Sequence, residues 1–335
     1  MGRKSTGNLP SAAARAQLDA EYAAIAIHWL EGRLMRFVQE SMPLRDRALA
    51  LGDTAYAAEI AFWMAAGANL AWDRNAEDYI TRAERLAKAA ELPALGARLQ
   101  GLRARLSYLR GDPIAMEAAA RRELAAAEEA GDPQAAAAAH LDLGETLLEQ
   151  VQLGEAKEEL TRALEAGEQA GDVQWLIEAH LGRALLALEL NELESADDFV
   201  AQALALVREE HVTVFVAIRL ALAQVRAAQR RDDEADRAFR DAIDTIGPTE
   251  YRRLVVDATI AYARFLAERD RLIEAEALIW PVEGLLQKRG YQIRRSEIAD
   301  IRALVRTRRK AASAVPTAKR RRTTGSRSGA TRSQA

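Results

Sequence analysis

The sequence repeats itself with a period of about forty residues. The tripeptide Ala-His-Leu at residues 139–141 recurs at residues 179–181, and the same offset, without a gap, aligns Leu160 with Val200. Self-similarity at such a period is typical of repeat arrays, in which each unit buries its apolar face against its neighbours. The repeat therefore predicts a stack of similar units rather than a domain built around one closed core.

Turn signals divide each repeat into two helical halves. Glycine followed by aspartate occurs at Gly52, Gly131 and Gly171, and this pair ends one helix and caps the next. A second turn, such as the one at Gly154, leaves halves of 16 to 20 residues with apolar residues at positions i, i+3, i+4 and i+7. The pattern predicts an all-α fold, an α-solenoid of about seven antiparallel hairpins. Their expected bounds are 12–51, 53–91, 93–130, 132–170, 172–209, 211–246 and 248–289.

Both ends of the chain depart from the repeat. An amphipathic segment at residues 291–312 predicts a helix that caps the array of residues 12–290. Residues 313–335 contain mostly Ser, Thr, Gly, Ala and Arg. Such a segment cannot bury enough apolar surface to offset the entropy of ordering it, so we expect a disordered basic tail. Residues 1–11 are likewise expected to be disordered, and they carry no apolar stretch of signal-peptide length.

Small residues occupy the positions where paired helices must approach each other. Alanine makes up about a fifth of the chain and aromatic residues only 5%, and helices cross closely only where side chains are short. In the best-defined unit, Gly144, Ala156 and Ala163 are the small residues, and Leu147 and Leu160 are their larger neighbours. In these residues the chain resembles the tetratricopeptide repeat family, in its longer kinesin-light-chain-like and bacterial regulatory form. The resemblance extends over about residues 12–290 and implies a right-handed superhelix.

The resemblance also implies that the first helix of each hairpin lines a concave groove for a partner peptide or helix. The positions expected to face this groove are Asn69, Arg98, Arg105, Tyr108, Glu145, Glu149, Glu178, Glu189, Gln224, Asp257, Arg264 and Glu268. They are basic toward the N-terminus and acidic in the middle, which favours a basic or mixed-charge peptide. The alternative is that they form solvated helix faces with i,i+4 ion pairs. Members of the family that grip a C-terminal carboxylate use Lys and Asn where this chain has Leu141 and Glu145, which disfavours that ligand.

Nothing in the sequence indicates catalysis. The chain has no cysteine, and it lacks a glycine-rich phosphate loop, a paired-histidine zinc motif and a serine nucleophile elbow. His140 and His180 recur in consecutive repeats and are expected to be buried and hydrogen-bonded rather than metal ligands. The five tryptophans, at positions 29, 63, 72, 175 and 280, are expected to pack in the core or the groove. We therefore predict a protein that is not an enzyme and uses no cofactor or metal.

The charge of the chain is divided unequally. The last thirty residues carry ten basic and no acidic residues, which leaves 37 basic and 50 acidic residues in the body, a net charge of −13. The basic residues that suggest non-specific contact with DNA or RNA are Arg308, Arg309, Lys310, Lys319, Arg320, Arg321 and Arg322. The tail has no aromatic residue for stacking on bases, which disfavours sequence-specific recognition. Docking of the tail on the acidic body, or no specific role, are the alternatives.

The leading hypothesis from sequence is a cytoplasmic, non-catalytic interaction scaffold that binds a partner protein in its concave groove and does not contact membranes. The second is a regulatory or nucleic-acid-associated protein, in which the solenoid senses a partner and the basic tail holds DNA or RNA. A third is an assembly platform that self-associates through the ends of the solenoid.

Overall fold

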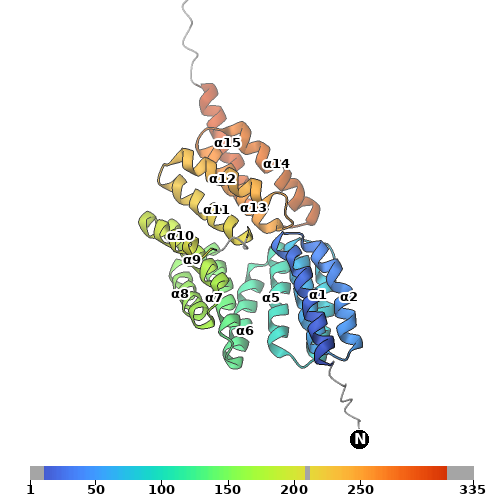
Figure 1. The fold of residues 1–335 in the computed structure, drawn as a ribbon. Helices are drawn as coiled ribbons and strands as arrows, with labels where there is room; N and C mark the ends of the chain where they lie inside the picture. Colours follow the sequence, from blue (N-terminus) through green and yellow to red (C-terminus); the bar gives the residue numbers. More distant parts are fainter. Residues whose placement is uncertain (1–10, 208–211, 315–335) are drawn as a thin grey trace, which may run out of the picture.

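The computed structural model describes residues 11–207 and 212–314, and this part of the chain consists of fifteen helices and no strand (Figure 1). The helices are α1 (Ala12–Leu30), α2 (Leu34–Ala50), α3 (Thr54–Leu70), α4 (Ala76–Ala89), α5 (Pro93–Leu109), α6 (Pro113–Ala130), α7 (Pro133–Glu149), α8 (Leu153–Ala170), α9 (Val173–Glu189), α10 (Leu193–Leu206), α11 (Val212–Ala228), α12 (Asp232–Ile246), α13 (Arg252–Glu268), α14 (Leu272–Arg289) and α15 (Arg295–Ala314). The predicted α-solenoid of seven antiparallel hairpins, followed by a single closing helix, is confirmed.

The helix ends follow the turn chemistry of the sequence. The Asp132 and Asp172 carboxylates accept hydrogen bonds from the backbone N–H groups of Gln134 (3.1 Å) and Gln174 (2.9 Å), which caps α7 and α9. Gly171 ends α8 in the left-handed conformation, with φ of 64°, which glycine adopts without steric cost. The hairpin bounds are therefore decided locally, by residues that lie next to each other in the chain.

Glycine also lets consecutive hairpins interlock. A Cβ atom added to Gly144 would lie 2.7 Å from the Leu160 side chain, and one added to Gly182 would lie 2.6 Å from it. Leu160 of α8 thus fills the space between α7 and α9, and it is fully buried. This close packing is the reason for the small residues that the repeat conserves at its helix crossings.

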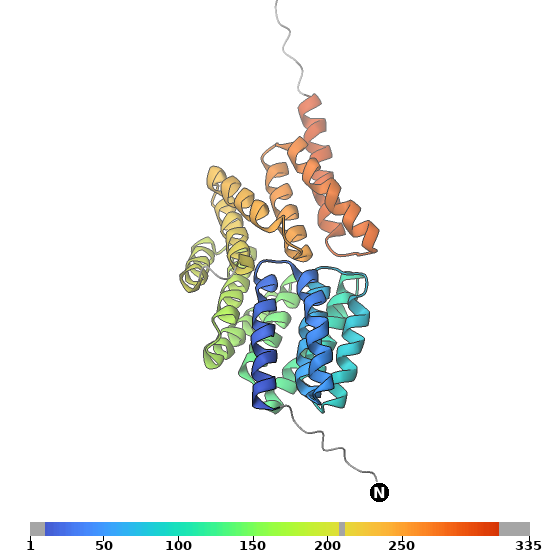
Figure 2. The same ribbon diagram turned by 45° about the vertical axis from the view of Figure 1, so that its right-hand side comes forward.

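The ends of the array meet, which the repeat pattern did not predict. Figures 1 and 2 show the last helices resting on the ends of the first hairpins. Glu250, between α12 and α13, donates its backbone N–H to the Gly32 carbonyl (2.9 Å), and its carboxylate accepts from the Met35 backbone N–H (2.7 Å). Because Met35 lies in the first turn of α2, a residue 215 positions away caps that helix.

The contacts of Glu250 form the first junction between the two ends of the array. At the second junction, the connection between α14 and α15 contacts the ends of α3 and α5. The Gln292 backbone N–H donates to the Leu109 carbonyl at the end of α5 (2.7 Å), and Tyr291 packs edge-on against Trp72 with ring centroids 5.0 Å apart. As a result, α1 to α5 and α11 to α15 share one hydrophobic cluster, whereas α6 to α10 bury their apolar residues in smaller clusters with their neighbours.

Several local expectations change in the structure. The closing helix starts at Arg295 rather than at residue 291, because Tyr291 and Gln292 form the second junction. Ser11 caps α1, and Ser313 and Ala314 belong to α15, so these three residues, which were expected to be disordered, are part of the helical array. The rest of both segments, 1–10 and 315–335, lies outside the described residues. No helix in the described part of the chain is long and apolar enough to cross a membrane.

Candidate binding site on the inner face

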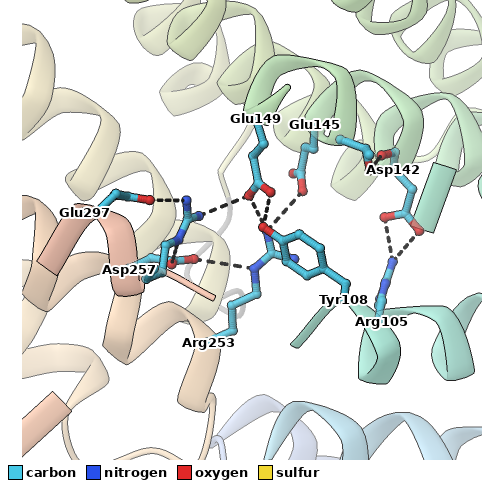
Figure 3. A network of polar contacts seen from close by, with 10 residues as sticks. Arg105, Tyr108, Asp142, Glu145, Glu149, Arg253, Asp257 and Glu297 are labelled. Carbon is cyan, nitrogen blue, oxygen red and sulfur yellow. Dashed lines mark hydrogen bonds and ion pairs between the residues drawn. The ribbon is translucent and has the colours of Figure 1, made fainter. Parts of the chain in front are cut away.

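The first helices α5, α7 and α13 bring charged side chains together on the inner face of the array (Figure 3). The Arg105 guanidinium of α5 donates through Nη2 to both carboxylate oxygens of Asp142 on α7, each at 2.6 Å. The Asp142 carboxylate raises the pKa of Arg105, so this arginine is held in its charged form. The pair ties two consecutive hairpins together across the inner face.

Glu149, at the end of α7, connects the middle of the array to its far end. Its carboxylate accepts a hydrogen bond from the Tyr108 hydroxyl of α5. It also lies 3.5 Å from Arg253 Nη2 of α13 and 3.2 Å from Arg294 Nη2, next to α15. The Arg294 side chain is 145 residues away in sequence, so only the return of the chain on itself brings these groups together.

Near the start of α15, the acidic side chains of the network are paired with arginines. Arg294 donates through Nε to Asp257 (3.0 Å) and through Nη1 to Glu297 (2.8 Å). Arg264 Nη2 lies 3.6 Å from Glu297. Asp257, with further support from Glu149 and Glu297, raises the pKa of Arg294. The carboxylates at this end already have cationic partners from the same chain.

The other end of the inner face carries a surplus of carboxylates. Glu123 of α6 is only 8% exposed, and it forms no hydrogen bond or ion pair with the residues that the structure describes. Burial, with a further contribution from Asp142, raises the pKa of Glu123 to about 7. Burial likewise raises the pKa of Glu178 on α9 to about 7, and it raises the pKa of Glu145 on α7. We call Glu123, Asp142, Glu145 and Glu178 the carboxylate cluster.

Three arginines lie near this cluster and do not fully neutralise it. Arg105 is engaged by Asp142, and the Arg98 guanidinium lies over the Phe62 ring, 4.1 Å from its centroid. Burial lowers the pKa of Arg98, although Glu123 opposes this effect. Arg253 Nη2 lies 3.9 Å from Glu145. Four carboxylates therefore face three guanidinium groups, and one of the three is stacked on an aromatic ring. Glu123 and Glu178 form no ion pair with the residues that the structure describes.

The structure brings seven of the predicted groove residues into this region. They are Arg105, Tyr108, Glu145, Glu149, Glu178, Asp257 and Arg264. Arg98 lies beside the carboxylate cluster and packs on Phe62. Asn69 is placed elsewhere, because its side chain is 4% exposed and its amide donates to the Leu102 carbonyl (2.9 Å).

The remaining three predicted residues lie apart from the network. Glu268 pairs with the adjacent Arg269, at 3.4 Å. Glu189 is exposed at the end of α9, and Gln224 is half-buried on α11. None of these three is joined to the inner network by a hydrogen bond or ion pair within the described residues.

Five members of the region were not found from the sequence, for three different reasons. Arg294 and Glu297 join it only because the array closes, and no local pattern indicates that closure. Arg253 had a usable signal, since it precedes the predicted residue Asp257 by four residues and shares its helix face. Glu123 lies on a second helix, which the resemblance excludes from the groove. Asp142 had a usable signal, since it precedes Glu145 by three residues and so shares its helix face.

The histidines and the basic segment also have definite places. His140 is buried with Nδ1 2.7 Å from Glu159, as expected. His180 Nδ1 is buried without a hydrogen-bond partner among the described residues, so the prediction that His180 is hydrogen-bonded is wrong. No group of metal-ligating side chains occurs in the part of the chain that is described. Arg308 and Arg309 lie on α15 and pair with Asp270 (3.2 Å) and Glu276 (2.6 Å). Lys310 also lies on α15, while Lys319, Arg320, Arg321 and Arg322 lie outside the described residues.

Comparison with known proteins identifies the fold only. No protein-family model and no curated protein matches the sequence. The structure is similar to a solved Rap protein in complex with Competence and Sporulation Factor, with a TM-score of 0.53 and 12% identity over 91% of this chain and 99% of that one. It also matches BtubC (BKLC) from P. vanneervenii, with a TM-score of 0.46 and 18% identity over 69% of this chain and 91% of that one.

The similarity to the Rap structure concerns the fold of the chain. The chain has the architecture of the tetratricopeptide-like helical repeat proteins, which consist of stacked helical hairpins.

Proposed function

We propose that the chain is a non-catalytic interaction scaffold whose inner face binds a segment of a partner protein through a basic residue. The observation that supports this most strongly is the carboxylate cluster, because Glu123 is buried without a cationic partner among the described residues. A buried carboxylate is stable in its charged form only when a cation and hydrogen-bond donors surround it. An arginine or lysine of the partner would supply that cation.

The charge balance of the inner face also favours one orientation of the partner. The Glu149, Asp257 and Glu297 carboxylates already contact Arg253 or Arg294, so a second cation gains little there. A basic residue is therefore expected near Glu123 and Glu178, which form no ion pair with the described residues and lie near Asp142 and Arg105. The similar Rap structure contains a bound factor, which is consistent with a binding role for this architecture.

Selection from a displayed peptide library on the full chain tests this proposal. We expect the enriched peptides to share a basic residue and to bind at least roughly tenfold more weakly to a Glu123→Gln, Glu178→Gln double variant, because desolvated charge pairs carry much of the affinity of such sites. Glu189→Gln is the matched control, since Glu189 is exposed on the same helix as Glu178. Enriched peptides without a basic residue, or equal affinity for the double variant, would contradict the proposal.

The second hypothesis, contact with nucleic acid through the basic segment, receives less support. Arg308 and Arg309 are paired with acidic side chains of the body, so contact with a phosphate would require them to exchange these partners. A role for the tail depends on the basic residues beyond position 314. Deletion of residues 315–335 should abolish any gel shift if that role exists, and an unchanged shift would remove the tail from it. The cytoplasmic location likewise remains a proposal.

A further inference from the structure

One surface of the array, on α14, is apolar where the corresponding surfaces of α8, α10 and α12 are mostly polar. On α14, Ile273 and Trp280 are 79% and 75% exposed, and Ala277 is exposed between them. The spacing of i, i+4 and i+7 places the three on one face of the helix. We call Ile273, Ala277 and Trp280 the α14 stripe. The sequence predicted that Trp280 packs in the core or groove, and its exposure shows that this prediction is wrong.

The repeat itself provides the comparison that makes the α14 stripe unusual. The buried residues Ala275 and Ile279 of α14 correspond to Ala156 and Leu160 of α8, so each outer position can be matched in the other second helices. The residues that match Ile273, Ala277 and Trp280 are Gly154, Glu158 and Thr161 in α8, Glu194, Asp198 and Ala201 in α10, and Asp233, Arg237 and Arg240 in α12. Exposed apolar residues gathered on one surface mark an interaction site, whereas single ones do not.

The α14 stripe borders a groove that can receive a large side chain. The groove has a volume of about 460 Å³ and lies between α14 and α15, with the buried residues Ile279, Ile301 and Val305 among those that line it. Trp280 stands at the edge of this groove. Figure 1 labels α14 and α15, the two helices that form it. In a twofold contact each copy presents the same surface to the other. An exposed aromatic side chain beside an apolar groove suits such a contact, because the side chain of each copy can enter the groove of the other.

The charges beside the α14 stripe favour a partner of mixed charge. On the side of α12, Glu274 lies 2.6 Å from Arg271 and 3.8 Å from Arg240. On the side of α15, Glu276 lies 2.6 Å from Arg309, and Glu283 contacts Arg302. Both edges therefore present acidic and basic groups together. A strongly acidic or basic partner, or an anionic membrane, would meet like charges, whereas a second copy presents both signs in the same arrangement.

We propose that two copies of this chain associate through the α14 stripe, in a twofold contact centred on Ala277. The small side chain at the centre lets the two copies of α14 approach, and each Trp280 enters the groove between α14 and α15 of the other copy. The proposal is independent of the inner face, which lies on the first helices of the repeats.

Sedimentation equilibrium of the full chain tests the association. We expect a dimer at about 100 µM, and we expect Trp280→Glu and Ile273→Glu to raise the dissociation constant at least tenfold. The matched control is Ile114→Glu, because Ile114 is 75% exposed and occupies the Ile273 position in α6, where Arg121 stands in place of Trp280. Circular dichroism establishes that each variant keeps its helices. A monomeric wild-type chain at that concentration, or a dimer unaffected by both stripe variants, would overturn the proposal.

Crosslinking locates the twofold axis. The chain contains no cysteine, so Ala277→Cys introduces a single thiol, and a residue on a twofold axis meets its own copy. We expect oxidation to give a disulfide-linked dimer with Ala277→Cys and none with Ala118→Cys, the corresponding position of α6. Equal crosslinking of the two variants, or binding of anionic vesicles by a chain that remains monomeric, would count against the second copy as the occupant.

Discussion

The two parts of this array are held together by different kinds of contact. Helices α6 to α10, the middle region, bury apolar residues only against helices close to them in sequence. Helices α1 to α5 and α11 to α15, the closing region, share one cluster that joins residues more than 200 positions apart. The comparison teaches that a repeat sequence can specify nearest-neighbour packing everywhere and still yield long-range cooperativity where the superhelix returns on itself.

The largest expected effect comes from the residue that joins the two ends of the closing region. Trp72 is 2% exposed and packs on Tyr291, so Trp72→Ala should reduce the free energy of unfolding by about 3–5 kcal/mol. Hydrogen exchange should become faster in α14 and α15 as well as in α3 and α4. Leu160→Ala is the control in the middle region, with a cost of about 2–5 kcal/mol and faster exchange in α7 to α9 only. Exchange changes confined to α3 and α4 in Trp72→Ala would contradict the long-range coupling.

The next effect depends on pH and belongs to the inner face of the middle region. The pKa of Glu123 is about 7 in the folded chain and near 4.3 when unfolded. Between these values the folded state keeps a proton that the unfolded state has lost, so the free energy of unfolding falls as pH rises toward 7, by at most about 4 kcal/mol. Glu123→Gln removes the titrating carboxyl, so this fall in the free energy of unfolding should be absent in the variant.

Urea denaturation at pH 5 and pH 8 measures the difference. The stability of Glu123→Gln relative to wild type should increase between the two pH values, because only the wild type must ionise a buried carboxyl. The exposed Glu189 provides the control, and Glu189→Gln should differ from wild type by the same amount at both. A constant difference for Glu123→Gln would show that this carboxylate is already stabilised in its charged form.

A smaller effect is expected at the first junction of the closing region. The Glu250 carboxylate caps α2 through the Met35 N–H, so Glu250→Ala should cost about 1 kcal/mol and should accelerate exchange of the Met35 amide. Glu192 occupies the N-cap of α10 without a side-chain cap hydrogen bond. Glu192→Ala should therefore change stability little. If both variants cost the same, capping across the junction does not contribute to closure.

The last effect, of similar size, is local and should leave the closing region unchanged. Val151 has a φ of 61° and is 73% exposed, and a β-branched residue is strained in this left-handed region. The equivalent turn one repeat later uses Asn191, with φ of 59°. Val151→Asn should raise the free energy of unfolding by about 1 kcal/mol, as measured by chemical denaturation. Ile114→Asn, which replaces an exposed apolar residue within a helix, should give no such gain.

The candidate site could be predicted only in part, for a reason that its residues make clear. Glu145, Glu149 and Glu178 follow from their place on first helices, because helix periodicity decides which face a residue occupies. Their partners Arg253 and Arg294 come from hairpins that lie far away in sequence. Glu123 reaches the same region from a second helix because the facing residue is Gly101, where a Cβ would lie 2.8 Å from its carboxylate.

The sequence by itself determined the helices, their caps and the interlocking of each hairpin with the next. These features depend on contacts within about forty residues, such as Asp172 at the start of α9 and Leu160 between Gly144 and Gly182. Only the tertiary structure decided that the array closes through Glu250 and Trp72, and which charges of the inner face are paired. The small rotations between successive hairpins add up along the whole array. The sequence of a single repeat therefore does not determine where the two ends of the array lie relative to each other.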